Sequence, residues 1–275
     1  MRLVHNSNST MHLPVLLQAR VAKEVGWDGI FVRDEHVRRY LDSEAGTLAE
    51  LRTALDPLTP VNLGALADIE RWRPLEQAAM LREAEALTEL AAGIGARDVQ
   101  VLSGPVDPGG DYVGPAELTR SELRRATAEG LRSVADVGEP HGIRYYLEPI
   151  AWTPLSLELA VEAIDAAERD NVGLVHLWNG GATPEAVARL DPRMIFGVDF
   201  GDSLGPPGGG LADQRSRRVW PGDGAIPLRE WTDAIRATGF DGWWDNELYS
   251  PPHWELDPFE IARGLLEVLR GAFDG

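Results

Sequence analysis

The amino-acid sequence predicts a single (β/α)8 TIM barrel of the α/β class, and three observations lead to that prediction. Short apolar runs alternate with amphipathic stretches along the whole chain of 275 residues, as in β/α units. The runs and stretches form eight pairs, and barrels of this kind typically have about 250 residues. An open doubly wound sheet would alternate in the same way, but no Gly-rich dinucleotide fingerprint follows the first run. We therefore expect one domain over residues 1–275.

The expected strands are short apolar runs bounded by Gly, Pro or polar residues, which is the pattern of buried parallel strands. In chain order they lie near residues 2–6, 29–33, 61–66, 98–103, 143–148, 171–176, 194–199 and 242–248.

The expected helices are amphipathic, and several begin with Pro or with Ser, Thr or Asp in the first turn. Glycines such as Gly26, Gly95 and Gly239 can adopt the left-handed conformation that ends a helix. In chain order the helices lie near residues 14–26, 47–55, 74–94, 115–138, 154–168, 183–190, 227–238 and 257–272.

Composition excludes several classes of function. The 26 basic and 44 acidic side chains give a net charge of −18, which repels a phosphate backbone, so we expect no nucleic-acid partner. The chain has no cysteine, so a metal would need Asp, Glu, His or water as ligands. The first residues lack the apolar region of a signal peptide and no apolar run is long enough for a membrane span, so we expect a cytoplasmic protein with no membrane partner.

One connection, residues 203–227, is long and rich in Gly and Pro. Loops of this kind are functional lids or mobile surface insertions. It follows the seventh expected strand, so in a barrel it would lie as a lid over the mouth.

Two carboxylates, Glu148 and Glu247, each close an expected strand. Carboxyl ends of barrel strands meet at one mouth, where two Glu can bind a divalent cation or exchange protons with a substrate. The alternative for each is a structural ion pair with an arginine of the barrel.

The ends of the sixth and seventh expected strands bring His176 and Asp199 to the same rim. Two Glu, one Asp and one His suit a hard or borderline cation such as Mn²⁺, Mg²⁺ or Co²⁺. Asp202 is a weaker candidate, which could hydrogen-bond a sugar hydroxyl, cap the lid or bind metal.

Further candidates for substrate binding are aromatic or basic. Tryptophan rings stack on sugars and exclude water, but they also pack barrel against helices, and one of the neighbours Trp243 and Trp244 must face outwards. Arg218 could bind a phosphate or carboxylate, or pair with surface acids. The candidates for substrate contact are Trp152, Trp178, Trp220, Arg218 and His36.

Several segments together resemble the xylose-isomerase-like TIM barrels of the sugar phosphate isomerase/epimerase superfamily. They are residues 147–149, 171–178, 195–202, 218–224 and 239–243, together with Glu247. The resemblance implies a metal ion held by Glu, Asp, His and Glu at the ends of strands five to eight, with the two glutamates as the acid/base pair. This chain lacks the Asp usual at strand six and has Asp199 where His, or sometimes Gln, is usual. Either His176 replaces the missing Asp, or the site binds metal weakly or not at all.

Three functions follow as hypotheses. The first is a metal-dependent isomerase or epimerase of a sugar, polyol or keto-sugar, in which the glutamates move a proton next to a carbonyl. The second is a lyase on the same scaffold, such as a dehydratase or a deglycosidase of an oxidised C-glycoside. The third is a non-catalytic sugar-binding subunit. In each the partner is a small carbohydrate or glycoside, and a homo-oligomer paired through the outer helices is an open alternative.

Overall fold

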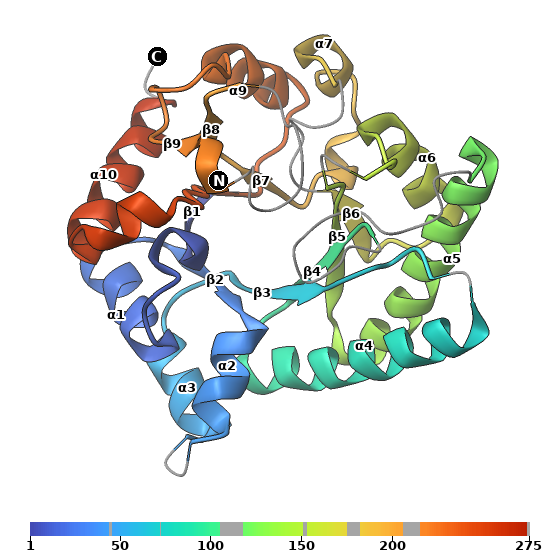
Figure 1. Ribbon diagram of the computed structural model, residues 1–275, viewed down its shortest axis with the longest axis horizontal. Coiled ribbons are helices and arrows are strands. Elements are labelled where there is room, and N and C mark those ends of the chain that lie inside the picture. Colours follow the sequence, from blue (N-terminus) through green and yellow to red (C-terminus); the bar gives the residue numbers. More distant parts are fainter. Residues whose placement is uncertain are drawn as a thin grey trace.

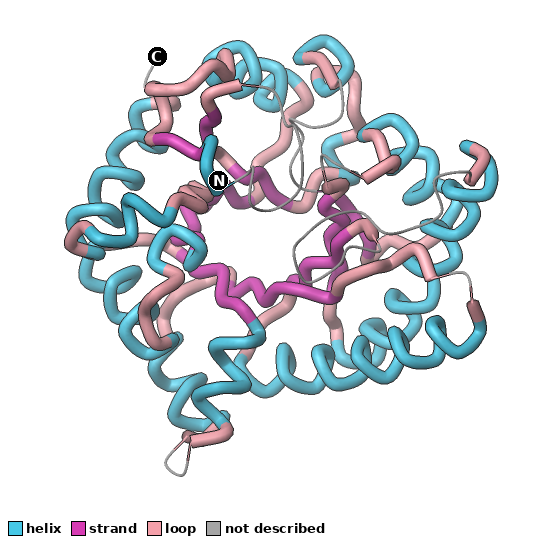
Figure 2. Tube along the Cα trace, in the orientation of Figure 1, coloured by secondary structure: helices cyan, strands magenta, loops and turns pink. Residues whose placement is uncertain are grey.

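The computed structural model describes residues 1–43, 46–71, 73–104, 118–150, 153–174, 182–205 and 215–273. Eight parallel strands surround the centre and the helices form an outer ring (Figures 1 and 2). The hydrogen-bonded order is β6-β5-β4-β3-β2-β1-β10-β7. A single parallel bridge between Leu174 and Ile195 joins the two ends of this order. The predicted (β/α)8 barrel is therefore confirmed.

The strands agree with the predicted runs, although the later ones are shorter. They are β1 (Arg2–Asn6), β2 (Gly29–Arg33), β3 (Val61–Leu66), β4 (Asp98–Leu102), β5 (Arg144–Glu148), β6 (Val172–Leu174), β7 (Gly197–Asp199) and β10 (Trp243–Asp245).

The helices follow the expected order, with one addition that the apolar pattern did not indicate, α2 (Asp34–Leu41). The others that bear on the site are α1 (Val15–Val25), α3 (Leu48–Leu55), α4 (Pro74–Ile94), α5 (Arg120–Gly138), α6 (Leu157–Ala167), α7 (Pro184–Val187), α9 (Leu228–Ala237) and α10 (Pro258–Gly271). Within the described residues, no helix is both long and apolar enough to cross a membrane.

Local sequence explains where the longest helices begin and end. Pro74 opens α4, and Gly95 ends it with a φ of 85°, a conformation that glycine adopts without strain. A capping box opens α5, in which Thr119 accepts from the amide of Glu122 and the Glu122 carboxylate accepts from the amide of Thr119. These signals fix the lengths of the β/α units and hence the positions of the strand ends.

An aromatic plug fills the middle of the barrel. It consists of Val4, Phe31, Tyr146, Phe196 and Trp243. The rings of Tyr146 and Trp243 meet edge to face with centroids 5.5 Å apart. The interior thus has two polar ends separated by an apolar middle.

Glycines make room for the rings of the plug. A Cβ on Gly173 would lie 2.3 Å from the ring of Phe196, and one on Gly197 would lie 2.1 Å from the ring of Trp243. Trp244 faces the other way and packs on Phe273, with ring centroids 5.0 Å apart. The prediction that the neighbouring tryptophans face opposite sides is confirmed.

The predicted lid, residues 203–227, lies partly outside the described residues. Its described base is a two-stranded antiparallel sheet of β8 (Asp202–Ser203) and β9 (Arg218–Val219).

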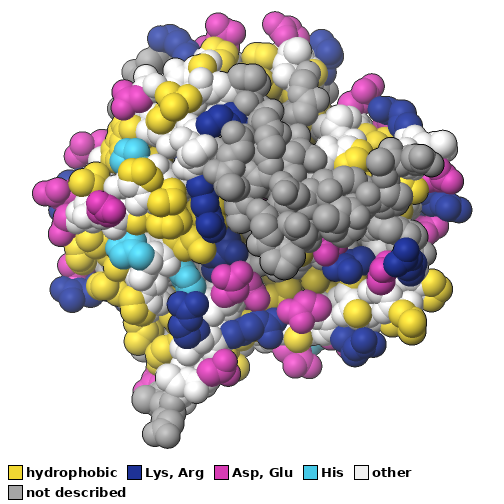
Figure 3. Space-filling model, in the orientation of Figure 1, with side chains coloured by type: hydrophobic (Ala, Val, Ile, Leu, Met, Phe, Trp, Pro, Cys, Tyr) yellow, Lys and Arg dark blue, Asp and Glu magenta, His cyan; other side chains and the backbone are white. Residues whose placement is uncertain are grey.

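Acidic and basic side chains alternate around the edge of the molecule in the view of Figure 3.

Candidate active site at the mouth of the barrel

Four carboxylates lie at or just beyond the carboxyl ends of three strands. Glu148 ends β5, Asp199 ends β7, and Asp245 ends β10, with Glu247 two residues further on. Alternate residues of a strand share a face, so Asp245 points to the same side as the plug residue Trp243. The predicted pair, Glu148 and Glu247, therefore belongs to one end of the barrel, together with a carboxylate that the sequence did not single out, Asp245.

Glu247 is held by two side chains. Its Oε1 accepts from Nδ2 of Asn8 at 2.9 Å, and its Oε2 lies 3.0 Å from Nη2 of Arg218. Only 12% of each side chain of the Arg218–Glu247 pair is exposed, so the charges are largely desolvated. Nη1 of Arg33 lies 3.4 Å from Oδ1 of Asn8 and extends the chain of contacts. The structural ion pair considered for the glutamates is thus present at Glu247.

Glu148 differs from Glu247 in the nature of its donor. Nε2 of Gln100 donates to Oε2 of Glu148 at 2.5 Å. Gln100 is a neutral amide on the neighbouring strand β4, so this bond orients the carboxylate without neutralising it. A half-buried carboxylate held in this way can serve as a proton acceptor.

Asp199 and Asp245 lie side by side, because they are register partners on the neighbouring strands β7 and β10. Nδ2 of Asn6 donates to Oδ2 of Asp245 at 2.9 Å. Burial, and then the negative charges of Asp199 and Glu247, raise the pKa of Asp245 well above its ordinary value. The arrangement favours a protonated Asp245 beside Asp199.

Several buried polar atoms at this end have no hydrogen-bond partner within the described residues. They include Oη of Tyr146, Nε of Arg33, Nε of Arg218 and Oδ1 of Asp245. Burial, followed by the charges of Asp199 and Asp245, raises the pKa of Tyr146 well above its ordinary value, so its hydroxyl stays a donor. Buried polar atoms are almost always satisfied in native proteins, so these indicate that the mouth receives a polar ligand or water.

The donor chemistry of this end fits a divalent cation. Glu148, Asp199 and Glu247 offer carboxylate oxygens, which hard and borderline cations prefer. Within the described residues, however, no three His, Asp or Glu side chains converge as a metal site. Since Arg218 supplies the positive charge beside Glu247, a cation there would compete with this guanidinium.

Asp202 has a structural role in the loop that follows β7. It is buried, and its carboxylate accepts from the amides of Gly222, Gly224 and Ile226 at 2.9, 3.0 and 3.1 Å. It also accepts from the amide of Ser203 at 2.8 Å. Of the roles considered for Asp202, the contacts match the anchor of the lid, since four amides occupy its oxygens.

Two other candidates, Trp220 and His36, have packing contacts of their own. Trp220 packs on α10, where a Cβ on Gly264 would come within 2.8 Å of its ring. His36 lies on the unexpected helix α2, is 6% exposed, and contacts Nε2 of Gln18 through Nδ1 at 3.1 Å. Both have packing partners that explain them without a substrate. The predicted candidates His176, Trp152 and Trp178 lie outside the described residues.

An aromatic cluster lies near the mouth, and its Tyr249 was not singled out from the sequence. Tyr249 and Trp254 meet edge to face with centroids 5.7 Å apart, and the guanidinium of Arg215 lies 4.9 Å from the centroid of Tyr249. Nε1 of Trp254 donates to the carbonyl of Asn8 at 2.9 Å, which ties this cluster to the Glu247 network. Only the spacing of aromatic residues after the last strand could have indicated it.

A buried carboxyl group, Glu70, lies in the loop after β3. Its Oε2 accepts from the amide of Gly104 at 2.7 Å, and its Oε1 from the hydroxyl of Thr127 on α5 at 3.1 Å. Burial raises the pKa of Glu70 to about 7. Its donors are neutral, so this group links loop and helix without an ion pair.

Comparison with known proteins places this geometry among related barrels. A family model for xylose isomerase-like TIM barrels matches residues 19–272. A curated inosose isomerase of Bacillus velezensis is 28% identical, with 98% of this chain and 95% of the relative covered. A curated inosose isomerase of Bacillus subtilis is 27% identical, with 96% and 94% covered.

Solved structures share the fold. The crystal structure of an IOLI protein with a bound zinc atom superposes with a TM-score of 0.86 at 23% identity, covering 99% of this chain and 98% of the other. The structure of an L-ribulose 3-epimerase superposes with a TM-score of 0.76 at 17% identity, covering 99% and 94%.

Proposed function

Because the chain belongs to the xylose isomerase-like TIM barrel family, we propose that it is an isomerase or epimerase of a sugar or a keto-polyol such as inosose. Curated relatives that match it over nearly their whole length are named inosose isomerases, which supports an isomerase. The observation that carries the proposal is the pair of glutamates at one end of the barrel, each oriented by an amide, from Gln100 or Asn8.

The proposed chemistry is proton transfer next to a carbonyl. One of Glu148 and Glu247 removes the proton from the carbon beside the carbonyl, and the electron pair moves to the carbonyl oxygen as an enediolate forms. The other glutamate, protonated at the start, gives its proton either to the opposite face of that carbon or to the former carbonyl carbon. In the second case the hydroxyl proton of the first carbon moves to the former carbonyl oxygen. The first outcome inverts a centre and the second moves the carbonyl.

The remaining groups bind and stabilise the substrate. The guanidinium of Arg218 and the hydroxyl of Tyr146 are donors that can face the negative oxygen of the enediolate. Asn8 and Gln100 hold the two carboxylates in place, so that little reorientation is needed during the reaction. The Tyr249–Trp254 cluster offers an apolar surface for a sugar ring.

A divalent cation is part of the proposal. Glu148, His176, Asp199 and Glu247 would hold it, and it would polarise the carbonyl of the substrate. Mn²⁺, Mg²⁺ and Co²⁺ suit these donors, and zinc is bound in the related IOLI protein.

The test is to replace Glu148 and Glu247 by Gln, singly and together, and to follow inosose conversion. Proton NMR in D₂O reports both product and exchange of the hydrogen next to the carbonyl. We expect each single change to lower turnover at least about 1000-fold, because it removes a group that transfers the proton. Glu230→Gln, an exposed residue of α9, is the matched control and should keep full activity. A double variant with near wild-type turnover would overturn the proposal.

The alternatives have their own readouts. The lyase gains no support from the names of these relatives, and incubation with 3-keto-glycosides would reveal it by release of the aglycone. The non-catalytic subunit predicts no turnover of any ketose and no uptake of a divalent cation, which metal analysis of the purified protein measures.

A further inference from the structure

A second polar cavity lies at the opposite end of the barrel, where the strands begin. Its volume is about 690 Å³. The charged residues of its lining are Arg2, Arg97, Arg144 and Asp98. Three guanidinium groups thus share one cavity with a single carboxylate, in a chain whose net charge is −18.

Arg144 is fixed in this cavity by neighbours from two strands. Its Nε and Nη2 donate to Oδ1 and Oδ2 of Asp98 at 2.6 and 2.9 Å. Its guanidinium also lies 4.5 Å from the centroid of the Phe196 ring. The carboxylate of Asp98 is therefore already paired, and it does not neutralise the other two arginines.

Arg2 and Arg97 carry positive charge that nothing in the described part of the chain balances. Nη1 of Arg2 donates only to the carbonyl of Thr59 at 3.1 Å, and both side chains are exposed. Near the end of α4 the carbonyls of Ala91 and Ala92 accept from the amides of Ala96 and Gly95, so these two carbonyls are already paired. Structural pairing therefore accounts for Arg144 and leaves these two arginines unexplained.

A fourth guanidinium adds to the positive charge. Nε of Arg52, on α3, would lie 3.8 Å from a Cβ placed on the lining residue Gly95. Arginine forks bind phosphate oxygens in pairs, and convergent forks are the usual device for holding phosphate groups.

We propose that this cavity is an anion site that binds a phosphate group, free or carried by a small metabolite. The site is independent of the proposed active site, because the aromatic plug separates the two ends of the barrel. The acidic mouth lies about 13 Å away along β5. Coulomb interactions weaken with distance, so the nearer guanidinium groups dominate the potential in the cavity.

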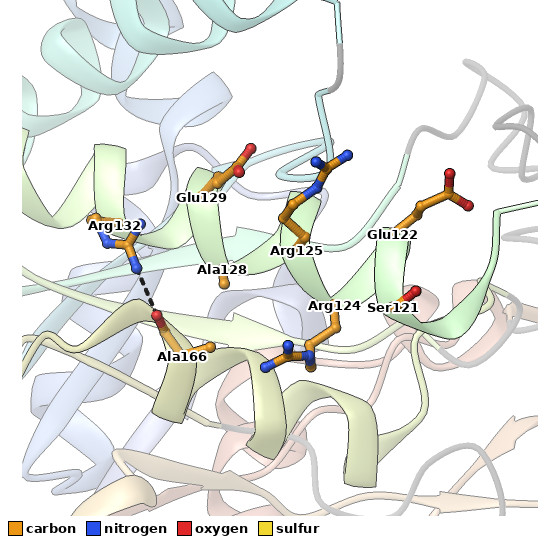
Figure 4. Close-up of a pocket in the computed structure, with 8 residues that line it drawn as sticks. All are labelled: Ser121, Glu122, Arg124, Arg125, Ala128, Glu129, Arg132 and Ala166. Atoms are coloured by element: carbon orange, nitrogen blue, oxygen red, sulfur yellow. Dashed lines mark hydrogen bonds between the residues drawn. The ribbon is translucent and has the colours of Figure 1, made fainter.

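The matched control comes from another cluster of arginines on the outside of the barrel. Figure 4 shows this groove between α5 and α6, where Arg125 lies between Glu122 and Glu129 along α5 and Arg124 points toward α6. Arg132 in the same groove donates to the carbonyl of Ala166 at 2.7 Å. Replacing Arg124 and Arg125 changes the net charge as much as replacing Arg2 and Arg97, but leaves the cavity intact.

The experiment is isothermal titration calorimetry of the full chain, in phosphate-free buffer, with inorganic phosphate, pyrophosphate and glucose 6-phosphate as probes. We expect saturable binding of at least one probe to the wild type, and at least about 10-fold weaker binding to the double variant Arg2→Gln/Arg97→Gln. The double variant Arg124→Gln/Arg125→Gln and the single variant Arg218→Gln should bind as the wild type does.

The relative affinities of the three probes identify the ligand class of the cavity. Tighter binding of glucose 6-phosphate than of phosphate assigns the site to a phosphorylated metabolite, and equal binding assigns it to the free oxyanion. Absence of saturable binding of all three probes would overturn the proposal. If the Arg124/Arg125 variant bound the probes as weakly as the Arg2/Arg97 variant, net charge alone would explain the loss of affinity, and the proposal would be overturned. It would also be overturned if Arg218→Gln lost binding, because the anion would then bind at the mouth of the barrel.

Discussion

The two ends of this barrel each contain an arginine–carboxylate pair, and the pairs are built differently. At the beginning of the strands, Arg144 and Asp98 form two hydrogen bonds of 2.6 and 2.9 Å, and the arginine is 45% exposed. At the mouth, Arg218 and Glu247 form one contact of 3.0 Å, and both side chains are 12% exposed.

The two pairs differ in the charges and hydrogen-bond donors around them that remain without a partner. The bidentate pair uses both oxygens of Asp98 and leaves the charge of the other arginines unbalanced. The mouth pair is buried, yet Nε of Arg218 has no partner within the described residues, although leaving a buried donor unpaired costs about 1–3 kcal/mol. A buried ion pair with an unpaired donor contributes little to the stability of the fold, and such pairs are typical of ligand-binding sites.

Among the tests of this contrast, the largest effect is expected for Arg218. Arg218→Gln should lower kcat/KM for the isomerase substrate about 100-fold, because it removes a charged donor from the site. Arg144→Gln should instead lower the free energy of unfolding and leave kcat/KM within about threefold of the wild type. Steady-state kinetics and urea unfolding of both variants measure this. The contrast fails if the two variants lose activity equally.

The next effect concerns Glu70, a mouth-side carboxyl group with neutral donors only. Its pKa is raised from 4.5 to about 7, so the folded state keeps a proton that the unfolded chain releases. The free energy of unfolding should therefore fall by up to about 3 kcal/mol as the pH rises through this window.

Glu70→Gln keeps a neutral group and should remove that part of the pH dependence. The charged groups nearest Glu70 on its own loop, Asp68 and Arg71, pair with each other at 2.6 Å and stay unchanged. Urea unfolding at pH 4.5 and pH 8 compares the two proteins. Parallel pH profiles would show that Glu70 titrates normally.

The smallest effect tests the plug that separates the two ends. Gly197→Ala would place a Cβ 2.1 Å from the ring of Trp243, so the ring must shift at a cost of about 1–3 kcal/mol. Gly271→Ala, at a glycine where an added Cβ would meet nothing within 4 Å, should not destabilise the protein. Thermal unfolding of the two variants gives the comparison, and equal stabilities would mean that the plug is loosely packed.

The sequence predicted the barrel well, because periodicity and caps are local signals. The charged helix α2 escaped detection, since a run such as Asp34 to Arg39 has little apolar periodicity. The prediction of an isomerase agrees with the names of the curated relatives.

The site was predicted only in outline. Glu148 and Glu247 were recognised as strand-end carboxylates, but their partners were not, because Asn8 and Glu247 are 239 residues apart in the chain. Asp245 was missed because it reads as part of an apolar strand, although its register partner Asp199 was found. Contacts between distant segments depend on strand register, which a single sequence does not specify.

The Asp202 carboxylate accepts hydrogen bonds from four backbone amides, and this has a consequence for engineering the loop. These hydrogen bonds fix the base of the loop, together with the contacts of Arg217 with Ser203 and Gly205. Since loop-closure entropy grows only slowly with length, the connection between Gly205 and Arg215 can be lengthened at a cost of about 0.6 kcal/mol per doubling. A library of grafted segments could therefore retune substrate preference while Arg218 keeps its place.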